Sequence, residues 1–191
     1  AQERRFDAAT RTWAAGGAAR GEPVDLVAAA TWLQRESGHP HRVPVGVVGT
    51  RDATPARYAA AEAIGRGLAA MDFAVLCGGR TGVMEGVCKG VKAAGGVSIG
   101  LLPGRDIADA NPYATYVIAS GIGEARNAII ARGALCLVAI GGGFGTLTEV
   151  AFARNYGKLV VGLEGAPQAG GVVHVASVEH ALELVARCAR G

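Results

Sequence analysis

The sequence predicts an α/β protein: a doubly wound, mostly parallel, Rossmann-like sheet with helices on both faces, preceded by an N-terminal helical arm. Apolar runs that end in glycine-rich turns occur at 45–49, 73–79 and 134–143, and a helical pattern follows each turn. A fully apolar run indicates a strand that is buried on both faces, as in parallel sheets. Ligands of such sheets lie at the carboxyl ends of the strands, near the switch in strand order.

The arm is expected to span residues 1–42, and the nucleotide-binding domain residues 43–191. Two helices are predicted in the arm: one with Phe6, Ala9, Thr10 and Trp13 on one face, and one that Pro23 begins, with Leu26, Ala30 and Leu33 on one face. The pair Gly16-Gly17 breaks the first pattern. The arm either packs on the sheet domain or across a dimer, or it forms a lid over the ligand.

Strands and helices alternate through the domain. The apolar runs predict strands at 43–49, 73–77, 97–102, 115–119, 134–140, 158–163 and 172–175, with helices at 55–70, 82–94, 125–133, 146–156 and 178–189. Thr54 and Pro55 suit the N-cap and the first position of the helix at 55–70. Gly157 suits the residue that follows a helix end. The polar loop 104–114 follows the carboxyl end of a strand, so it is expected to border the ligand.

The turn at 141–149 reads GGGFGTLTE and is the most informative stretch of the chain. Glycines let the backbone turn tightly and approach a ligand closely. Thr146 is expected to open the next helix, whose unpaired N–H groups favour an anion. Glu149 is expected in the first helical turn, beside the uncharged, reacting part of the ligand. The stretch therefore predicts a phosphate cradle with an acid next to it.

These motifs resemble the LOG family, the cytokinin-activating phosphoribohydrolases of the SLOG superfamily. The stretch 142–149 fits the family signature GGxGTxxE, and the turn 77–84 is similar to a second glycine-rich turn of the family. Arg126 falls where the family has an arginine. The similarity covers about residues 43–187 and is closer to the branch that includes the molybdenum cofactor carrier protein, which shares the patterns at 121–126, 99–103 and 173–176.

The chain also departs from both groups. LOG enzymes have proline where this chain has Gly141, lysine where it has Asn127, and glycine where it has Cys77. The carrier branch tends to lose the second glycine of the signature, whereas Gly142 and Gly143 are both present here. The sequence therefore has features of an enzyme group and of a binding group.

The candidate catalytic residues are Glu149 and Arg126. An arginine near a helix start opposes the helix dipole, so a ligand phosphate or the Glu149 carboxylate is expected to offset its charge. Asp52 is a further candidate, for a ribose hydroxyl. The candidate ligand- and phosphate-binding residues are Gly49, Thr50, Arg51, Gly78, Gly79, Arg80, Thr81, Gly82, Met84, Gly142, Gly143, Phe144, Gly145 and Thr146. No metal site is expected, because His39 and His41 flank a proline without other ligands nearby, and His174 and His180 fall in a predicted strand and a predicted helix.

Two functions from different classes follow. As a phosphoribohydrolase, the protein would cleave the N-glycosidic bond of a nucleoside 5′-monophosphate, with Glu149 stabilising the oxocarbenium-like transition state. As a carrier or sensor, it would hold a phosphorylated ligand such as molybdenum cofactor without turnover. Neither function requires a further cofactor; the bound molecule would be a nucleoside monophosphate or molybdenum cofactor.

Composition limits the classes of partner and the cellular compartment that we expect for this protein. The net charge is +3 with dispersed arginines, which argues against nucleic acid as a partner. The apolar runs are too short to span a membrane. Four cysteines without a C-x-x-C motif favour reduced thiols and a cytoplasmic protein. The resemblance implies a homodimer or a larger homo-oligomer.

Overall fold

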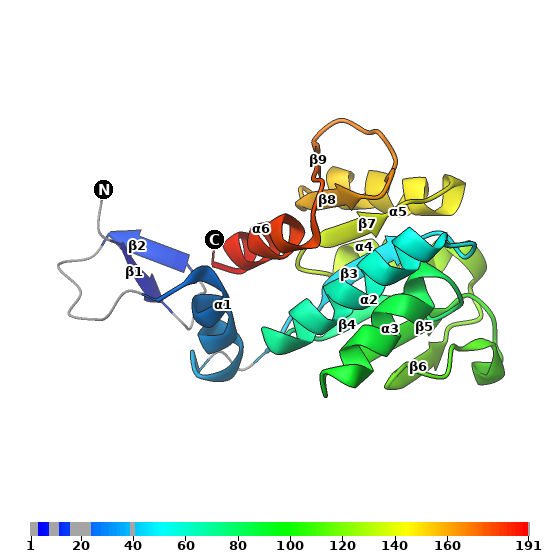
Figure 1. Cartoon of the computed structure of the whole chain (residues 1–191), viewed down its shortest axis with the longest axis horizontal. Coiled ribbons are helices and arrows are strands. Elements are labelled where there is room, and N and C mark those ends of the chain that lie inside the picture. The colour runs from blue at the N-terminus through cyan, green and yellow to red at the C-terminus, as the bar shows by residue number, and fades with distance from the viewer. Residues whose placement is uncertain (1–3, 8–11, 16–23, 39–40, 191) are drawn as a thin grey trace.

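A seven-stranded parallel sheet forms the centre of the molecule, in the order β6-β5-β4-β3-β7-β8-β9 (Figure 1). The computed structural model describes residues 4–7, 12–15, 24–38 and 41–190. The strands are β3 (Val45–Gly49), β4 (Val75–Cys77), β5 (Ser98–Leu102), β6 (Tyr116–Ala119), β7 (Leu137–Ile140), β8 (Val160–Leu163) and β9 (Val172–His174). Every neighbouring pair runs parallel, which confirms the predicted fold class.

Helices cover both faces of this sheet and give three layers. They are α2 (Pro55–Ala70), α3 (Val83–Ala93), α4 (Arg126–Gly133), α5 (Phe144–Asn155) and α6 (Val178–Arg190). Val47 on β3 packs in the core under α2, α3 and α6, whereas its neighbour Val48 packs in the core under α4 and α5. Successive strand residues face opposite sides, so a run that is apolar throughout supplies both cores.

The order of the strands places a ligand crevice beside β3. From β3 the chain adds β4, β5 and β6 on one side, then crosses over to β7, which pairs with β3 on the other side. The carboxyl ends of β3 and β7 meet at Gly49 and Ile140. In doubly wound sheets this switch point is where ligands bind.

Glycines bring α2 and α3 into backbone contact. A Cβ atom on Gly65 of α2 would overlap the carbonyl oxygen of Val87 on α3. In the opposite direction, a Cβ atom on Gly90 of α3 would overlap the carbonyl oxygen of Glu62 on α2. The two helices lie side by side on the same face of the sheet (Figure 1), and side chains larger than hydrogen do not fit at these positions.

The N-terminal segment differs from the predicted pair of helices. Its described parts include β1 (Arg4–Asp7) and β2 (Thr12–Ala15), which pair antiparallel with Phe6 opposite Trp13. The first predicted helix is therefore wrong; its positions Ala9 and Thr10 lie outside the described residues. Aromatic residues and threonine favour strands, and a stretch ended by glycines at 16–17 is short for a stable helix.

The second predicted helix of the arm is present as α1 (Leu26–Arg35). The side chain of Asp25 caps it, with Oδ1 accepting a hydrogen bond from the amide of Ala28 at 2.7 Å. Helix α1 packs against α6 (Figure 1). None of the helices in the described ranges combines the length and the apolar character needed to cross a bilayer.

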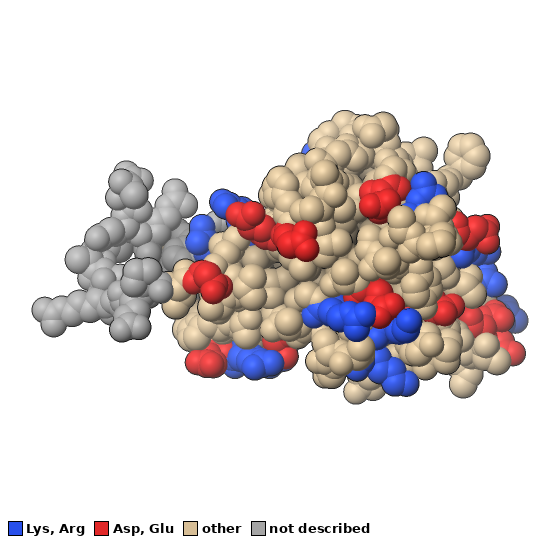
Figure 2. Space-filling view, in the orientation of Figure 1, with Lys and Arg blue, Asp and Glu red and all other residues tan. Residues whose placement is uncertain are grey.

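Charges of both signs are mixed on the face that Figure 2 shows. Acidic side chains lie beside basic ones over this face. On α2 and α3, Glu62 contacts both Arg66 and Lys89. The two basic side chains are exposed and Glu62 is partly buried, so solvent still screens these pairs.

Candidate functional site

A pocket of about 500 Å³ opens at the carboxyl ends of β3, β4 and β7. It lies at the switch in strand order, where the fold predicts a ligand. The residues that line it are Val48, Gly49, Thr50, Arg51, Asp52, Gly78, Met84, Glu124, Arg126, Asn127, Gly143, Phe144, Gly145, Thr146, Thr148 and Glu149. A volume of this size suits a small-molecule ligand.

A buried ion pair lies at the base of this pocket. Nη1 of Arg126 donates a hydrogen bond to Oε1 of Glu149 at 2.9 Å, and the two side chains are only 5% and 7% exposed. Arg126 is the first residue of α4, and Glu149 lies on α5. The contact expected between these two residues is therefore present, and it joins the start of α4 to the middle of α5 on one face of the sheet.

Burial changes the acidity of Glu149. Loss of solvent raises the pKa of this carboxyl from 4.5 to about 7, although the Arg126 guanidinium acts in the opposite direction. Burial is the larger effect, and the contact with the Arg126 guanidinium offsets only part of it. A carboxyl group with a pKa near neutrality exchanges a proton readily at physiological pH, which suits a general acid or base.

The turn after β4 holds the Arg126 guanidinium in place. A Cβ atom on Gly78 would lie 2.6 Å from Nη2 of Arg126 and 2.7 Å from Sδ of Met84. Any larger residue would displace the guanidinium or the thioether. The close approach of the arginine and of Met84 is therefore what favours glycine at this position.

The N-terminus of α5 faces the same pocket and begins earlier than predicted. Gly143 is its N-cap and has no side chain to form a capping bond, so Thr146 does not open the helix. The amide of Leu147 makes the first backbone bond of the helix, to the carbonyl of Gly143. The N–H groups of the first three helical residues, 144–146, therefore have no partner within the helix, and such groups attract anions.

The later position of Glu149 corrects a second prediction. It is the sixth residue of α5 rather than part of the first turn. The helix dipole acts mainly on the terminal turn, so it does not account for a carboxylate here. Glu149 instead contacts Arg126 and lines the pocket.

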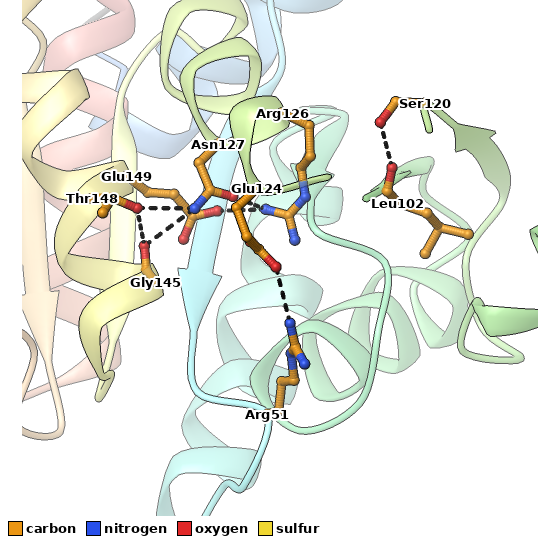
Figure 3. A network of polar contacts seen from close by, with 9 residues as sticks. All are labelled: Arg51, Leu102, Ser120, Glu124, Arg126, Asn127, Gly145, Thr148 and Glu149. Carbon is orange, nitrogen blue, oxygen red and sulfur yellow. Dashed lines mark hydrogen bonds and ion pairs between the residues drawn. The ribbon is translucent and has the colours of Figure 1, made fainter. Parts of the chain in front are cut away.

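Asn127 links the two helices in a network that the sequence did not reveal (Figure 3). Its amide nitrogen donates to Oγ1 of Thr148 at 2.9 Å and to the carbonyl of Gly145 at 3.5 Å, while its oxygen accepts a bond from Nη1 of Arg126. Thr148 also donates to the carbonyl of Gly145 at 2.7 Å. Asn127 therefore positions both the arginine and the first turn of α5.

Five lining residues are outside the set of binding residues that the sequence predicts: Val48, Asp52, Glu124, Asn127 and Thr148. Asp52 was considered for a ribose hydroxyl, and it does reach the pocket. The other polar residues lie one or two positions from Arg126 or Glu149 in the sequence. Their closeness in sequence to Arg126 and Glu149 was the available signal that they line the pocket, since residues near the start of a helix lie at the same edge of the sheet.

Some predicted binding residues lie in the turns but outside the pocket lining: Gly79, Arg80, Thr81, Gly82 and Gly142. Gly82 is the N-cap of α3 with φ +69°, and a Cβ atom there would overlap the carbonyl oxygens of residues 50 and 51. The side chain of Asn111 holds the carbonyls of Gly79 and Arg80 at 3.0 and 3.2 Å. These residues shape the turn, and their contact with a ligand stays a prediction.

The doubly wound sheet with glycine-rich turns and a pocket at the switch point defines a Rossmann-like α/β protein. The chain belongs to the SLOG cluster4 family, whose family model matches residues 42–187. This match confirms the family resemblance that the glycine-rich motifs indicate.

Solved structures of similar chains cover most of this fold. The molybdenum cofactor binding protein of the phototrophic bacterium Rippkaea orientalis is 31% identical with a TM-score of 0.72, over 76% of this chain and 96% of that one. The molybdenum cofactor carrier protein of Chlamydomonas reinhardtii is 34% identical with a TM-score of 0.71, over 78% of this chain and 98% of that one.

A comparison of sequences also finds a relative. An uncharacterised protein of Archaeoglobus fulgidus is 36% identical over 63% of this chain and 79% of its own length.

Proposed function

We propose that the protein binds a phosphorylated, nucleotide-like ligand of the molybdenum cofactor type in this pocket and serves as its carrier. The observation that carries the proposal is the pocket at the α5 N-terminus, in a chain similar over nearly their full lengths to two proteins described as binding or carrying that cofactor. The proposal is thus the second of the two functions that the sequence suggested.

The residues of the pocket suit an anionic ligand. Unpaired N–H groups at 144–146 offer a site for a phosphate. Among the described residues, Nε of Arg126 is a buried donor without a hydrogen-bond partner, and a buried donor left unsatisfied is costly. A ligand oxygen at this position would satisfy it. Phe144 is 89% exposed at the pocket edge and offers a flat surface for a heteroaromatic ring.

The same pocket supports a second candidate, phosphoribohydrolase activity. A specific observation favours it: Glu149 lines the pocket and burial raises its pKa to about 7. A group of this kind could deprotonate a water or stabilise a developing oxocarbenium ion. Arg126 would then orient the carboxylate through its 2.9 Å bond.

Compartment and assembly are part of the proposal. All four cysteines are free thiols, which supports a reducing compartment such as the cytoplasm. Exposed apolar side chains on α4 and α5 support a homodimer or a larger homo-oligomer: Ile129, Phe144, Leu147 and Phe152. Light scattering on the purified protein measures that state directly.

Purification from cells that make molybdenum cofactor tests the two functions together. We expect the protein to copurify with molybdenum, measured by mass spectrometry, and with a pterin, measured by fluorescence after oxidation. The matched control is Gly143→Val, which fills the space in front of the α5 N-terminus. The parent protein is also incubated with nucleoside 5′-monophosphates and analysed for free base.

The outcomes separate the candidates. Pterin and molybdenum on the parent, with loss from Gly143→Val and no free base, support the carrier function. Release of free base that Glu149→Gln abolishes supports the enzyme. Equal amounts of pterin on parent and Gly143→Val, without turnover, would place the ligand elsewhere and contradict the proposed pocket.

A further inference from the structure

One ion pair of the pocket lies at its solvent-exposed side. Nη2 of Arg51 lies 3.3 Å from Oε1 of Glu124, and the two side chains are 50% and 61% exposed. Arg51 follows β3, whereas Glu124 lies in the short 3₁₀ helix η2 (Gly123–Ala125) that precedes α4. In Figure 3 the guanidinium of Arg51 points to the carboxylate of Glu124. The contact joins two segments that both line the pocket.

The charges that line the pocket give this pair a role. Its cations are Arg51 and Arg126, and its acidic residues are Asp52, Glu124 and Glu149. Arg126 is buried and contacts Glu149. Arg51 is therefore the solvent-accessible cation of the pocket lining, and in the free protein its guanidinium contacts Glu124.

We propose that Glu124 tunes the affinity of the pocket for anions: it occupies Arg51 in the free protein and yields it to the phosphate of an entering ligand. This inference rests on the proposed binding of a phosphorylated ligand in the pocket. An exposed ion pair is weak, so a ligand displaces it at small cost. A phosphate dianion forms stronger, bidentate bonds to a guanidinium than the single contact it replaces.

The exchange sets how tightly an anionic ligand binds. An anion that binds Arg51 must displace Glu124, so the pair weakens the binding of every such ligand. A neutral ligand leaves the pair intact and is bound without help from Arg51. Glu124 therefore lowers the affinity of the pocket for phosphate monoesters and leaves its affinity for their neutral analogues unchanged.

Calorimetric titrations of four variants test this exchange: Glu124→Gln, Arg51→Gln, the double variant, and Asp52→Asn. The probes are guanosine 5′-monophosphate, inorganic phosphate and, as the neutral control, guanosine. Asp52→Asn is the matched control because it removes one negative charge from the same pocket without removing the partner of Arg51.

We expect Glu124→Gln to bind the monophosphate and inorganic phosphate more tightly, by a factor of up to about five, the upper end for releasing an exposed ion pair. Guanosine binding should be unchanged. In the Arg51→Gln background the gain should disappear, and Asp52→Asn should give a smaller gain that persists without Arg51.

Three other results would overturn the exchange: no gain or weaker binding in Glu124→Gln, a gain equal to that of Asp52→Asn, or a gain that survives in the double variant. Failure of both phosphate probes to bind the parent and every variant would instead contradict the proposed function. The two failures are thus distinguished in one set of titrations.

Discussion

Replacing Glu149 by glutamine should stabilise the protein at alkaline pH. The carboxyl is buried against Arg126, and burial raises its pKa from 4.5 to about 7. Between these values the folded protein keeps a proton on Glu149 that the unfolded chain has released. The free energy of unfolding therefore falls as the pH rises through this window. Glutamine carries no ionisable proton, so the variant does not incur this loss.

The size of the effect follows from the pKa. A rise from 4.5 to about 7 corresponds to about 3 kcal/mol of unfolding free energy, because one pKa unit corresponds to about 1.4 kcal/mol. The parent should be as stable as Glu149→Gln below pH 4.5 and progressively less stable up to pH 7. Above pH 7 the difference should stay near its full value.

Urea denaturation at pH 5, 6, 7 and 8 measures this difference for both proteins. Glu124→Gln is the matched control, since it removes an exposed carboxylate from the same pocket. Its effect on stability should be about 1 kcal/mol or less at each pH. The reasoning would be refuted if Glu149→Gln were no more stable than the parent at pH 8, or if its advantage grew toward acid pH.

Three further substitutions test the other parts of the pocket. Arg126→Met leaves the Glu149 carboxylate buried without its cation and should lower the free energy of unfolding by about 3–5 kcal/mol at pH 8. The loss should be smaller at pH 5, where Glu149 is protonated, and equal losses in urea would contradict this. Gly143→Val meets open space at φ −132°; its unfolding free energy should change by about 0.5 kcal/mol or less, while calorimetry should show loss of guanosine 5′-monophosphate binding. Gly78→Ala should displace Nη2 of Arg126 or Sδ of Met84 and cost about 1–3 kcal/mol; an unchanged melting temperature would show that both groups move freely.

Local patterns in the sequence were sufficient for the sheet and for most of the helices. Helix α2 begins at Pro55, as predicted, because Thr54 is an N-cap that a sequence shows directly. Helix α5 begins at Phe144, earlier than predicted, because its N-cap Gly143 carries no side chain to mark it. The pairing of β1 with β2 depends on contacts between segments, which periodicity does not reveal.

The site was predictable in its glycine turns and in one pair of side chains. Arg126 at a helix start needed a negative partner, and that argument led to Glu149. The contact of Arg51 with Glu124 has no comparable signal, because both residues are exposed and lie 73 positions apart. In the sequence, Asn127 is marked only by its departure from a family pattern. Its bonds to Thr148 and Gly145 depend on how α4 and α5 pack.

The glycine contacts between α2 and α3 determine which side of the pocket could change during evolution. Gly65 and Gly90 leave no space between the two helices. The distance between the turn that precedes α2 and the turn that precedes α3 is therefore fixed. A lineage that adapts to a bulkier ligand would have to alter the opposite wall, formed by η2 and the starts of α4 and α5. Differences in ligand preference among homologues should therefore map to residues 122–127 and 143–149, while the turns at 49–54 and 78–82 stay nearly constant.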